Sequence, residues 1–231
     1  MNFAQALRRA SRRDPSGPAL LDGDRRVDFL ALDMTAQRIA TILARQHGLA
    51  PGDRVAVLLP DTPELAFAAY GILWAGGVIC ALGPDTDPGA LADALTSTGA
   101  KLLIGWHAQA EAVEQVGRAL DIDWLLVEPR EFSRLLAATP PHAPLADVAA
   151  DAPAMLLEPA PLLELAHAEL ALRASDAAHE MGLAPGVVIP APASLSHPLN
   201  QIRTLHAAVT AGAALRFAAT PVVTARYLSW R

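Results

Sequence analysis

Three side chains near the end of the sequence have the types that nucleophilic chemistry uses. Ser194, Ser196 and His197 lie within four residues of one another, and a serine hydroxyl beside an imidazole can be an activated nucleophile. Adjacent residues of an extended segment point to opposite sides, however, and no Gly-x-Ser-x-Gly elbow is present. The pattern therefore does not predict a serine hydrolase.

The seven histidines invite a metal-binding hypothesis, which their spacing does not support. His167 and His179 lie twelve residues apart on one predicted helix, a separation of about 18 Å, so they cannot share an ion. His197 and His206 have no cysteine or carboxylate cluster nearby. We predict no metal site, and we expect Glu164 to form a surface pair with His167 on that helix.

Composition limits the compartment and the partners. The single cysteine, Cys80, excludes an intramolecular disulfide and lies in an apolar segment, where we expect it to be buried. A net charge of −6 argues against a nucleic-acid partner. The arginine-rich start predicts an amphipathic helix rather than a signal peptide. The expected location is the cytoplasm.

The uncharged run from Leu65 to Leu82 is long enough to be considered as a membrane span. Gly71, Gly76 and Gly77 interrupt it, which favours a buried helix ending near Trp74, followed by a central strand. We therefore predict no membrane span.

An internal repeat is the strongest architectural signal. GLAPGDRVAVLLP at 48–60 is matched by GLAPGVVIPAPAS at 182–194. Each follows a helical pattern and precedes an apolar helix and a further strand. We expect Gly52 and Gly186 to end turns directly before strands of one sheet system. Helices and strands that alternate in this way predict a three-layer α/β fold with mostly parallel sheets and an internally repeated strand-helix-strand unit.

More α/β alternation lies between the repeats. Helices are expected at 91–98 and 110–120, and strands at 101–106 and 123–128. The proline- and alanine-rich segment 139–153 is the expected linker. The predicted organisation is a first α/β subdomain at 1–138, a linker or crossing segment at 139–153, and a second α/β segment at 154–231.

Several stretches resemble the adenylate-forming (AMP-binding) acyl-CoA synthetase and ligase superfamily. Residues 49–84 place Pro-Gly-Asp-Arg-Val before one apolar strand and Ala-Gly-Gly before another, as members of that family do. Residues 18–43 look like the family's opening hairpin and first helix, and 96–104 continue the match. The resemblance implies the fold of the family's N-terminal domain.

The family's phosphate loop is missing from its expected place. Asp151, residues 155–157, Leu163 and His167 fit the flanking frame, in which members carry a loop rich in glycine, threonine and lysine. Here the loop position holds only Glu158, Pro159, Ala160, Pro161 and Leu162. A polyphosphate needs close backbone N–H groups, hydroxyls and a cation, whereas a carboxylate repels it. We expect no nucleotide cofactor.

The resemblance also points to a candidate acyl pocket. Family members carry an aromatic residue and a histidine in a context like Pro-Leu-Phe-His-x-x-Gly. This chain retains the histidine as His197, with Ser196 at the aromatic position and Asn200 at the glycine position. The implied pocket is reshaped and more polar.

The sequence stops at Arg231, before the family's remaining motifs and its C-terminal domain with the catalytic lysine. We expect a helix to begin near Val222, and we expect a shortened homologue relative to the family. The only lysine, Lys101, is expected to be structural.

Two kinds of function follow. The leading hypothesis is a catalytically degenerate homologue that acts as a binding or assembly protein for an acyl ligand, a carrier protein or a partner enzyme. We also expect the chain to associate, either with itself as a homo-oligomer or with such a partner. The alternative is a repurposed enzyme acting on an acyl intermediate in the former acyl pocket, or residual acyl-CoA or AMP ligase activity. A remnant of a decayed ligase gene is a third reading.

Overall fold

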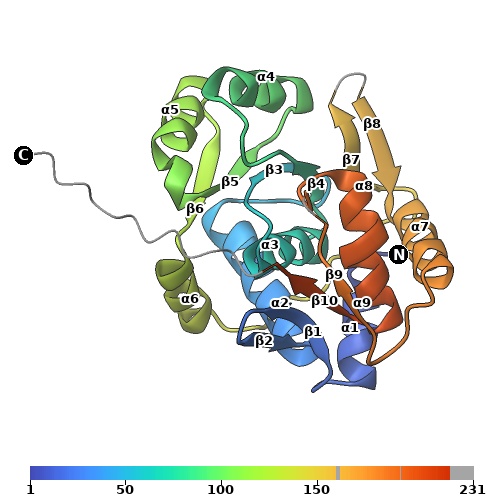
Figure 1. Cartoon of the computed structure of the whole chain (residues 1–231). Helices are drawn as coiled ribbons and strands as arrows, with labels where there is room; N and C mark the ends of the chain where they lie inside the picture. The colour runs from blue at the N-terminus through green and yellow to red at the C-terminus, as the bar shows by residue number, and fades with distance from the viewer. Residues whose placement is uncertain (160–161, 193, 219–231) are drawn as a thin grey trace, which may run out of the picture.

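The computed structural model describes residues 1–159, 162–192 and 194–218. It contains a six-stranded sheet in the order β6-β5-β3-β4-β7-β8 and a four-stranded sheet in the order β2-β1-β10-β9 (Figure 1). The larger sheet consists of β3 (Arg54–Leu58), β4 (Val78–Ala81), β5 (Leu102–Trp106), β6 (Asp123–Val127), β7 (Pro153–Pro159) and β8 (Leu162–Ala166). The smaller one consists of β1 (Pro18–Asp22), β2 (Arg25–Asp28), β9 (Val188–Pro190) and β10 (Ala214–Phe217).

The helices are distributed along the whole chain. The longer ones are α1 (Gln5–Arg13), α2 (Phe29–Gln46), α3 (Pro63–Trp74), α4 (Pro88–Thr98), α5 (Ala110–Leu120), α6 (Pro129–Ala138) and α7 (His167–Glu180). A short turn η1 (His107–Gln109) precedes α5, and α8 (Pro198–Asn200), the π-helical turn η2 (Gln201–His206) and α9 (Ala207–Ala211) follow one another without a break. The helices and strands expected between the repeats are confirmed.

Helices pack on both faces of the larger sheet. α4 and α5 lie on one side, and α2 and α3 lie on the other (Figure 1). Helix α3 also contacts β1, so it lies between the two sheets. The predicted three layers are present around the larger sheet, and the smaller sheet adds a further layer. All twelve residues of α3 are buried, which a helix enclosed on every side requires.

The run from Leu65 to Leu82 is divided as the sequence predicts. Helix α3 ends at Trp74, and β4 pairs in parallel with β3 and β7 in the interior of the sheet. A central parallel strand is covered on both faces, which accounts for the continuous apolar run. Among the described residues no helix is long and apolar enough to cross a membrane.

The two repeats adopt the same backbone conformation. Gly48 and Gly182 have φ of 61° and 62°, and Gly52 and Gly186 both have φ of 88°. These left-handed conformations favour glycine, because it lacks Cβ. Strands β3 and β9 then begin two residues after the second glycine of each turn. The prediction that each turn directly precedes a strand is confirmed.

The second strand of each unit is also equivalent. β4 pairs in parallel with β3 from Arg54 opposite Val78, and β10 pairs in parallel with β9 from Val188 opposite Ala214. The expectation of a single sheet system is wrong, since the first unit lies in the larger sheet and the second in the smaller one. Strand β10 of the second unit pairs with β1, which is distant in sequence. This pairing places the second unit in the smaller sheet.

The segment 139–152 contains no helix or strand, and it is held by hydrogen bonds to distant residues. Trp74 Nε1 donates to the carbonyl of Ala143 at 3.0 Å, and the N–H of Ala146 donates to the carbonyl of Trp74 at 3.0 Å. Both sheets contain strands from before and after this segment. The division into subdomains stays a prediction, and the helix expected near Val222 lies outside the described residues.

Candidate functional site

A cavity of about 230 Å³ lies beside the carboxyl end of β4. Strands β4 and β7 supply an apolar wall, and the segment between β9 and α8 supplies a polar one. The lining residues are Cys80, Ala81, Leu82, Gly83, Thr98, Leu156, Leu157, Ser194, Ser196, His197 and Pro198. In α/β proteins, ligands commonly bind at the carboxyl ends of parallel strands. This cavity is therefore the candidate site.

The structure brings two of the three sequence-predicted pocket residues into this cavity. Ser196 is buried and His197 is exposed at its edge. Asn200 does not line the cavity, but its Nδ2 donates to the carbonyl of Ser194 at 2.8 Å. Asn200 thus fixes the shape of the polar wall rather than facing a ligand.

The serines do not form a nucleophile pair with the histidine. The hydroxyl oxygens of Ser194 and Ser196 lie 3.3 Å apart and hydrogen bond to each other. Within the described residues, no hydrogen bond joins either hydroxyl to the His197 imidazole. The geometry provides hydrogen-bonding groups for a ligand and lacks the base contact that an activated serine requires.

Asp61 contacts the segment that forms the polar wall, and the sequence analysis missed it. It follows β3, and its Oδ1 accepts hydrogen bonds from the backbone N–H groups of Leu195 at 2.8 Å and Ser196 at 3.2 Å. Burial raises the pKa of Asp61, and the two hydrogen bonds oppose that shift. A carboxylate directly after a predicted parallel strand is the signal that could have identified it.

Cys80 lies in β4 with its side chain buried, as the sequence predicts. Burial raises the pKa of its thiol to about 12. A thiol with such a pKa is protonated at neutral pH and is a poor nucleophile. Cys80 therefore acts as an apolar lining group.

The strands on either side of the expected phosphate-loop position, β7 and β8, pair with each other as antiparallel neighbours. β7 pairs with β8, with Glu158 opposite Leu163 and Pro159 opposite Leu162. Ala160 and Pro161 lie outside the described residues. The hairpin adjoins the cavity through Leu156 and Leu157 of β7.

A second cavity of about 330 Å³ lies between the last turns of α2 and the segment 139–152. It is lined mainly by alanines and prolines, with Thr41, Arg45 and His142 as polar groups. It contains none of the sequence-predicted site residues. We therefore regard the smaller cavity as the candidate site.

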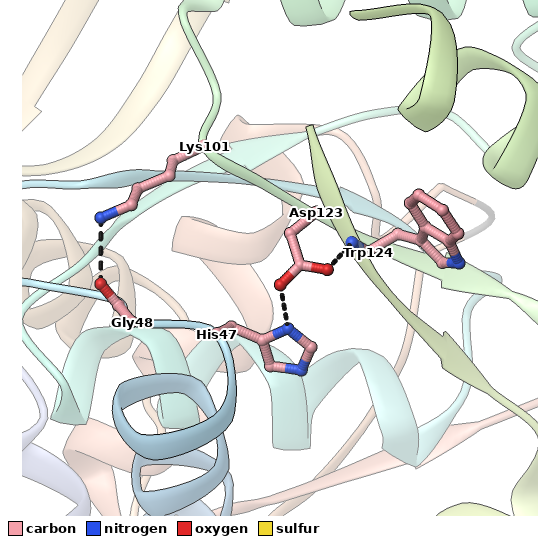
Figure 2. A network of polar contacts seen from close by, with 5 residues as sticks. All are labelled: His47, Gly48, Lys101, Asp123 and Trp124. Carbon is pink, nitrogen blue, oxygen red and sulfur yellow. Dashed lines mark hydrogen bonds and ion pairs between the residues drawn. The ribbon is translucent and has the colours of Figure 1, made fainter. Parts of the chain in front are cut away.

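Lys101 takes part in a structural network at the opposite, amino-terminal edge of the larger sheet. Its Nζ donates to the carbonyl of Gly48 at 2.9 Å, as Figure 2 shows, and forms an ion pair with Asp53 at 2.7 Å. His47 pairs with Asp123 at 2.6 Å in the same region (Figure 2). The expectation that Lys101 is structural agrees with this position.

His167 and His206 are both fully buried. His167 Nδ1 accepts the backbone N–H of Phe3 at 3.1 Å. The expected pair of Glu164 with His167 is wrong, because Glu164 lies on β8 and pairs with Arg54 at 2.7 Å. Helix α7 begins only at His167, so the two residues do not share a helix face. Among the described residues, no group of three or more potential ligands could hold a metal ion.

Comparison with known proteins assigns the family. The family model described as "AMP-binding enzyme" matches residues 7–157. Over 116 residues the chain is 36% identical to the long-chain fatty acid transport protein 1 of Mus musculus, covering 48% of this chain and 18% of that protein. The chain thus spans less than a fifth of that relative.

Solved structures share the fold over most of this chain. The apo structure of MbtA from Mycobacterium smegmatis is 27% identical with a TM-score of 0.84, covering 96% of this chain and 44% of that one. A benzoate CoA ligase from Burkholderia xenovorans LB400 is 25% identical with a TM-score of 0.83, covering 96% of this chain and 46% of that one. The family match and the shared fold agree with the resemblance that the sequence motifs carry: this chain belongs to the AMP-binding enzyme family.

Proposed function

We propose that this chain binds a small carboxylic acid or its acyl derivative in the cavity beside Ser196 and His197, without adenylating it. One observation carries the proposal: a cavity with an apolar wall and a polar wall adjoins a hairpin that lacks the residue types of a phosphate loop. The apolar wall suits a hydrocarbon or ring, and the polar wall suits a carboxylate or carbonyl.

The size of the cavity favours a small ligand. Its volume of about 230 Å³ lies below the roughly 300–1,000 Å³ of pockets that hold drug-sized molecules. A long acyl chain would not fit within it, whereas a single aromatic ring would. The benzoate CoA ligase among the similar structures makes benzoate a reasonable first ligand.

We expect benzoate to bind in this cavity, and a bulky side chain there to prevent binding. Ala81 lines the cavity, so Ala81→Phe should weaken benzoate binding by at least about tenfold, since an occupied pocket excludes its ligand. Titration calorimetry on the folded variants measures the affinity. Ala44→Phe, which fills part of the second cavity, is the matched control and should bind normally. Equal binding by Ala81→Phe and the unmodified protein would contradict the proposal.

The loss of adenylation rests on the residues of the β7–β8 hairpin. The family match ends at Leu157, directly before the five residues that contain no glycine, hydroxyl or cation. Pro159 and Pro161 have no N–H to offer, and Glu158 would repel phosphate oxygens. The ladder pairing of Glu158 and Pro159 with β8 supports the view that this backbone does not cradle a polyphosphate.

Pyrophosphate exchange into ATP should stay at background with benzoate and a panel of other carboxylic acids. The physical reason is that residues 158–162 contain no glycine, hydroxyl or cation to hold the phosphate oxygens. A benzoate CoA ligase assayed in parallel provides the positive control. Exchange above the level of a no-protein blank would show that adenylation survives.

A repurposed enzyme is the second candidate, favoured by the hydroxyls of Ser194 and Ser196 at the cavity. Such an enzyme would cleave an acyl thioester, and hydrolysis of benzoyl-CoA that Ser196→Ala removes would favour it over simple binding. The missing hydrogen bond to His197 in the described residues supports the binding role instead.

We also propose a protein partner, either a second copy of the chain or a carrier protein or enzyme. Large apolar side chains are exposed on β8, α7 and α8, namely Leu163, Leu172 and Leu199, at 46–61% of their surface. Contact with a partner would remove this apolar surface from water.

A further inference from the structure

We propose that Asp61 is a positioning residue that holds the polar wall of the cavity in place. Ser194, Ser196 and His197 line that wall, and the carboxylate of Asp61 accepts the backbone N–H groups of Leu195 and Ser196. The effect of Asp61 on ligand binding rests on the function proposed above. Its role in holding residues 194–197 in place does not depend on that function.

The hydrogen bonds show why Asp61 matters for this segment. His197 N–H and Asn200 Nδ2 both donate to the carbonyl of Ser194, and the two serine hydroxyls bond to each other. All of these bonds stay between residues 194 and 200. Within the described residues, Asp61 accepts the only hydrogen bonds that residues 194–197 make to a part of the chain distant in sequence.

Burial makes the two bonds to Asp61 strong restraints. Leu195 is fully buried and Ser196 is 3% exposed, so water cannot readily replace the carboxylate as their acceptor. Hydrogen bonds to a charged acceptor are about twice as strong as neutral ones. Without the carboxylate, both N–H groups would lose a partner in a desolvated position.

The internal repeat explains where this contact lies, because its two residues occupy equivalent positions in the two units. Asp61 lies in the turn between β3 and α3 of the first unit, and Leu195 lies at the corresponding place between β9 and α8 of the second. Proline begins the helix after each turn, at Pro63 and Pro198. Equivalent turns of the two units therefore contact each other beside the cavity, and Asp61 connects segments that follow strands of the two sheets.

Amide hydrogen exchange tests this assignment. In Asp61→Ala, the amides of Leu195 and Ser196 should exchange roughly 10- to 100-fold faster than in the unmodified protein, because two charge-assisted hydrogen bonds are lost. Asp61→Asn keeps an oxygen acceptor without the charge and should give a smaller increase. The benzoate affinity should fall in the same order.

Asp53→Ala is the matched control, because Asp53 also accepts a backbone N–H, from Ala50 at 2.7 Å, but at the amino-terminal end of β3. It should leave exchange at Leu195 and Ser196 unchanged. Unchanged exchange at these two amides in a folded Asp61→Ala overturns the assignment. Should that variant not fold, unchanged exchange in Asp61→Asn does so. If the unmodified protein does not bind benzoate, the proposed function fails, while the exchange rates still decide the role of Asp61.

Discussion

Lowering the pH from 7 to 5 should reduce the free energy of unfolding by on the order of 4 kcal/mol, with about half from each of His167 and His206. Burial lowers the pKa of His167 to about 4 and that of His206 to about 3, from an ordinary value of 6.5. Below pH 6.5 the unfolded chain therefore binds protons that the folded protein does not. The stability that the neutral, buried histidines provide is complete above pH 6.5. It is lost as the pH falls toward the pKa values that the two histidines have in the folded protein.

The surroundings of both rings explain why the folded protein excludes the proton. His167 Nδ1 accepts the N–H of Phe3, and a protonated ring could not do so. His206 lies 3.3 Å from the hydroxyl of Tyr70 and meets the ring of Phe3 edge-on at 5.1 Å. The Nε2 atoms of both histidines are buried, and neither has a hydrogen-bond partner among the described residues. A charge on either ring would thus be buried and uncompensated.

Urea unfolding at pH 7 and pH 5 measures the effect. His206→Gln should lose about half of the pH dependence, since Gln does not titrate in this range. His179→Gln is the control, because His179 is exposed on α7 and its replacement should leave the dependence intact. The same unfolding free energy at both pH values would show that the buried rings do not control acid stability.

Gly71→Ala should destabilise the protein by about 1–3 kcal/mol, although alanine is by about 1 kcal/mol the better helix former. An added Cβ at Gly71 would lie 2.2 Å from Ile39 Cγ2 and 2.5 Å from Ile39 Cβ. The Cβ of Ile39 is fixed to the backbone of α2 and cannot turn away. Helices α2 and α3 would have to separate.

A double-mutant cycle checks that the cause is this contact. Ile39→Gly removes both clashing atoms, Cβ and Cγ2, and is itself destabilising, but Gly71→Ala should cost little in its presence, because no side chain remains to clash. Gly89→Ala in the exposed first turn of α4 is the matched control and should be nearly neutral. Additive effects of Gly71→Ala and Ile39→Gly would contradict the explanation.

Much of the local structure could be predicted from the sequence. The GLAPG turns gave both glycine positions and the start of β3 and β9, because a left-handed turn conformation depends on the glycine itself. The division of the run from Leu65 to Leu82 followed from glycines and length in the same way. The residue types at 158–162 likewise show from the sequence that this position has no glycine, hydroxyl or cation to offer a phosphate.

The tertiary structure alone decided which of these elements meet. The two repeats look alike along the chain, but the pairing of β1 with β10 assigns the second one to another sheet. Asp61 and Leu195 form a hydrogen bond although they are 134 residues apart in sequence. Glu164 forms an ion pair with the distant Arg54 rather than with its sequence neighbour His167. Turns and helix starts are set by interactions between neighbours in sequence, whereas the cavity, its restraint and the buried histidines depend on contacts that form only when distant segments pack.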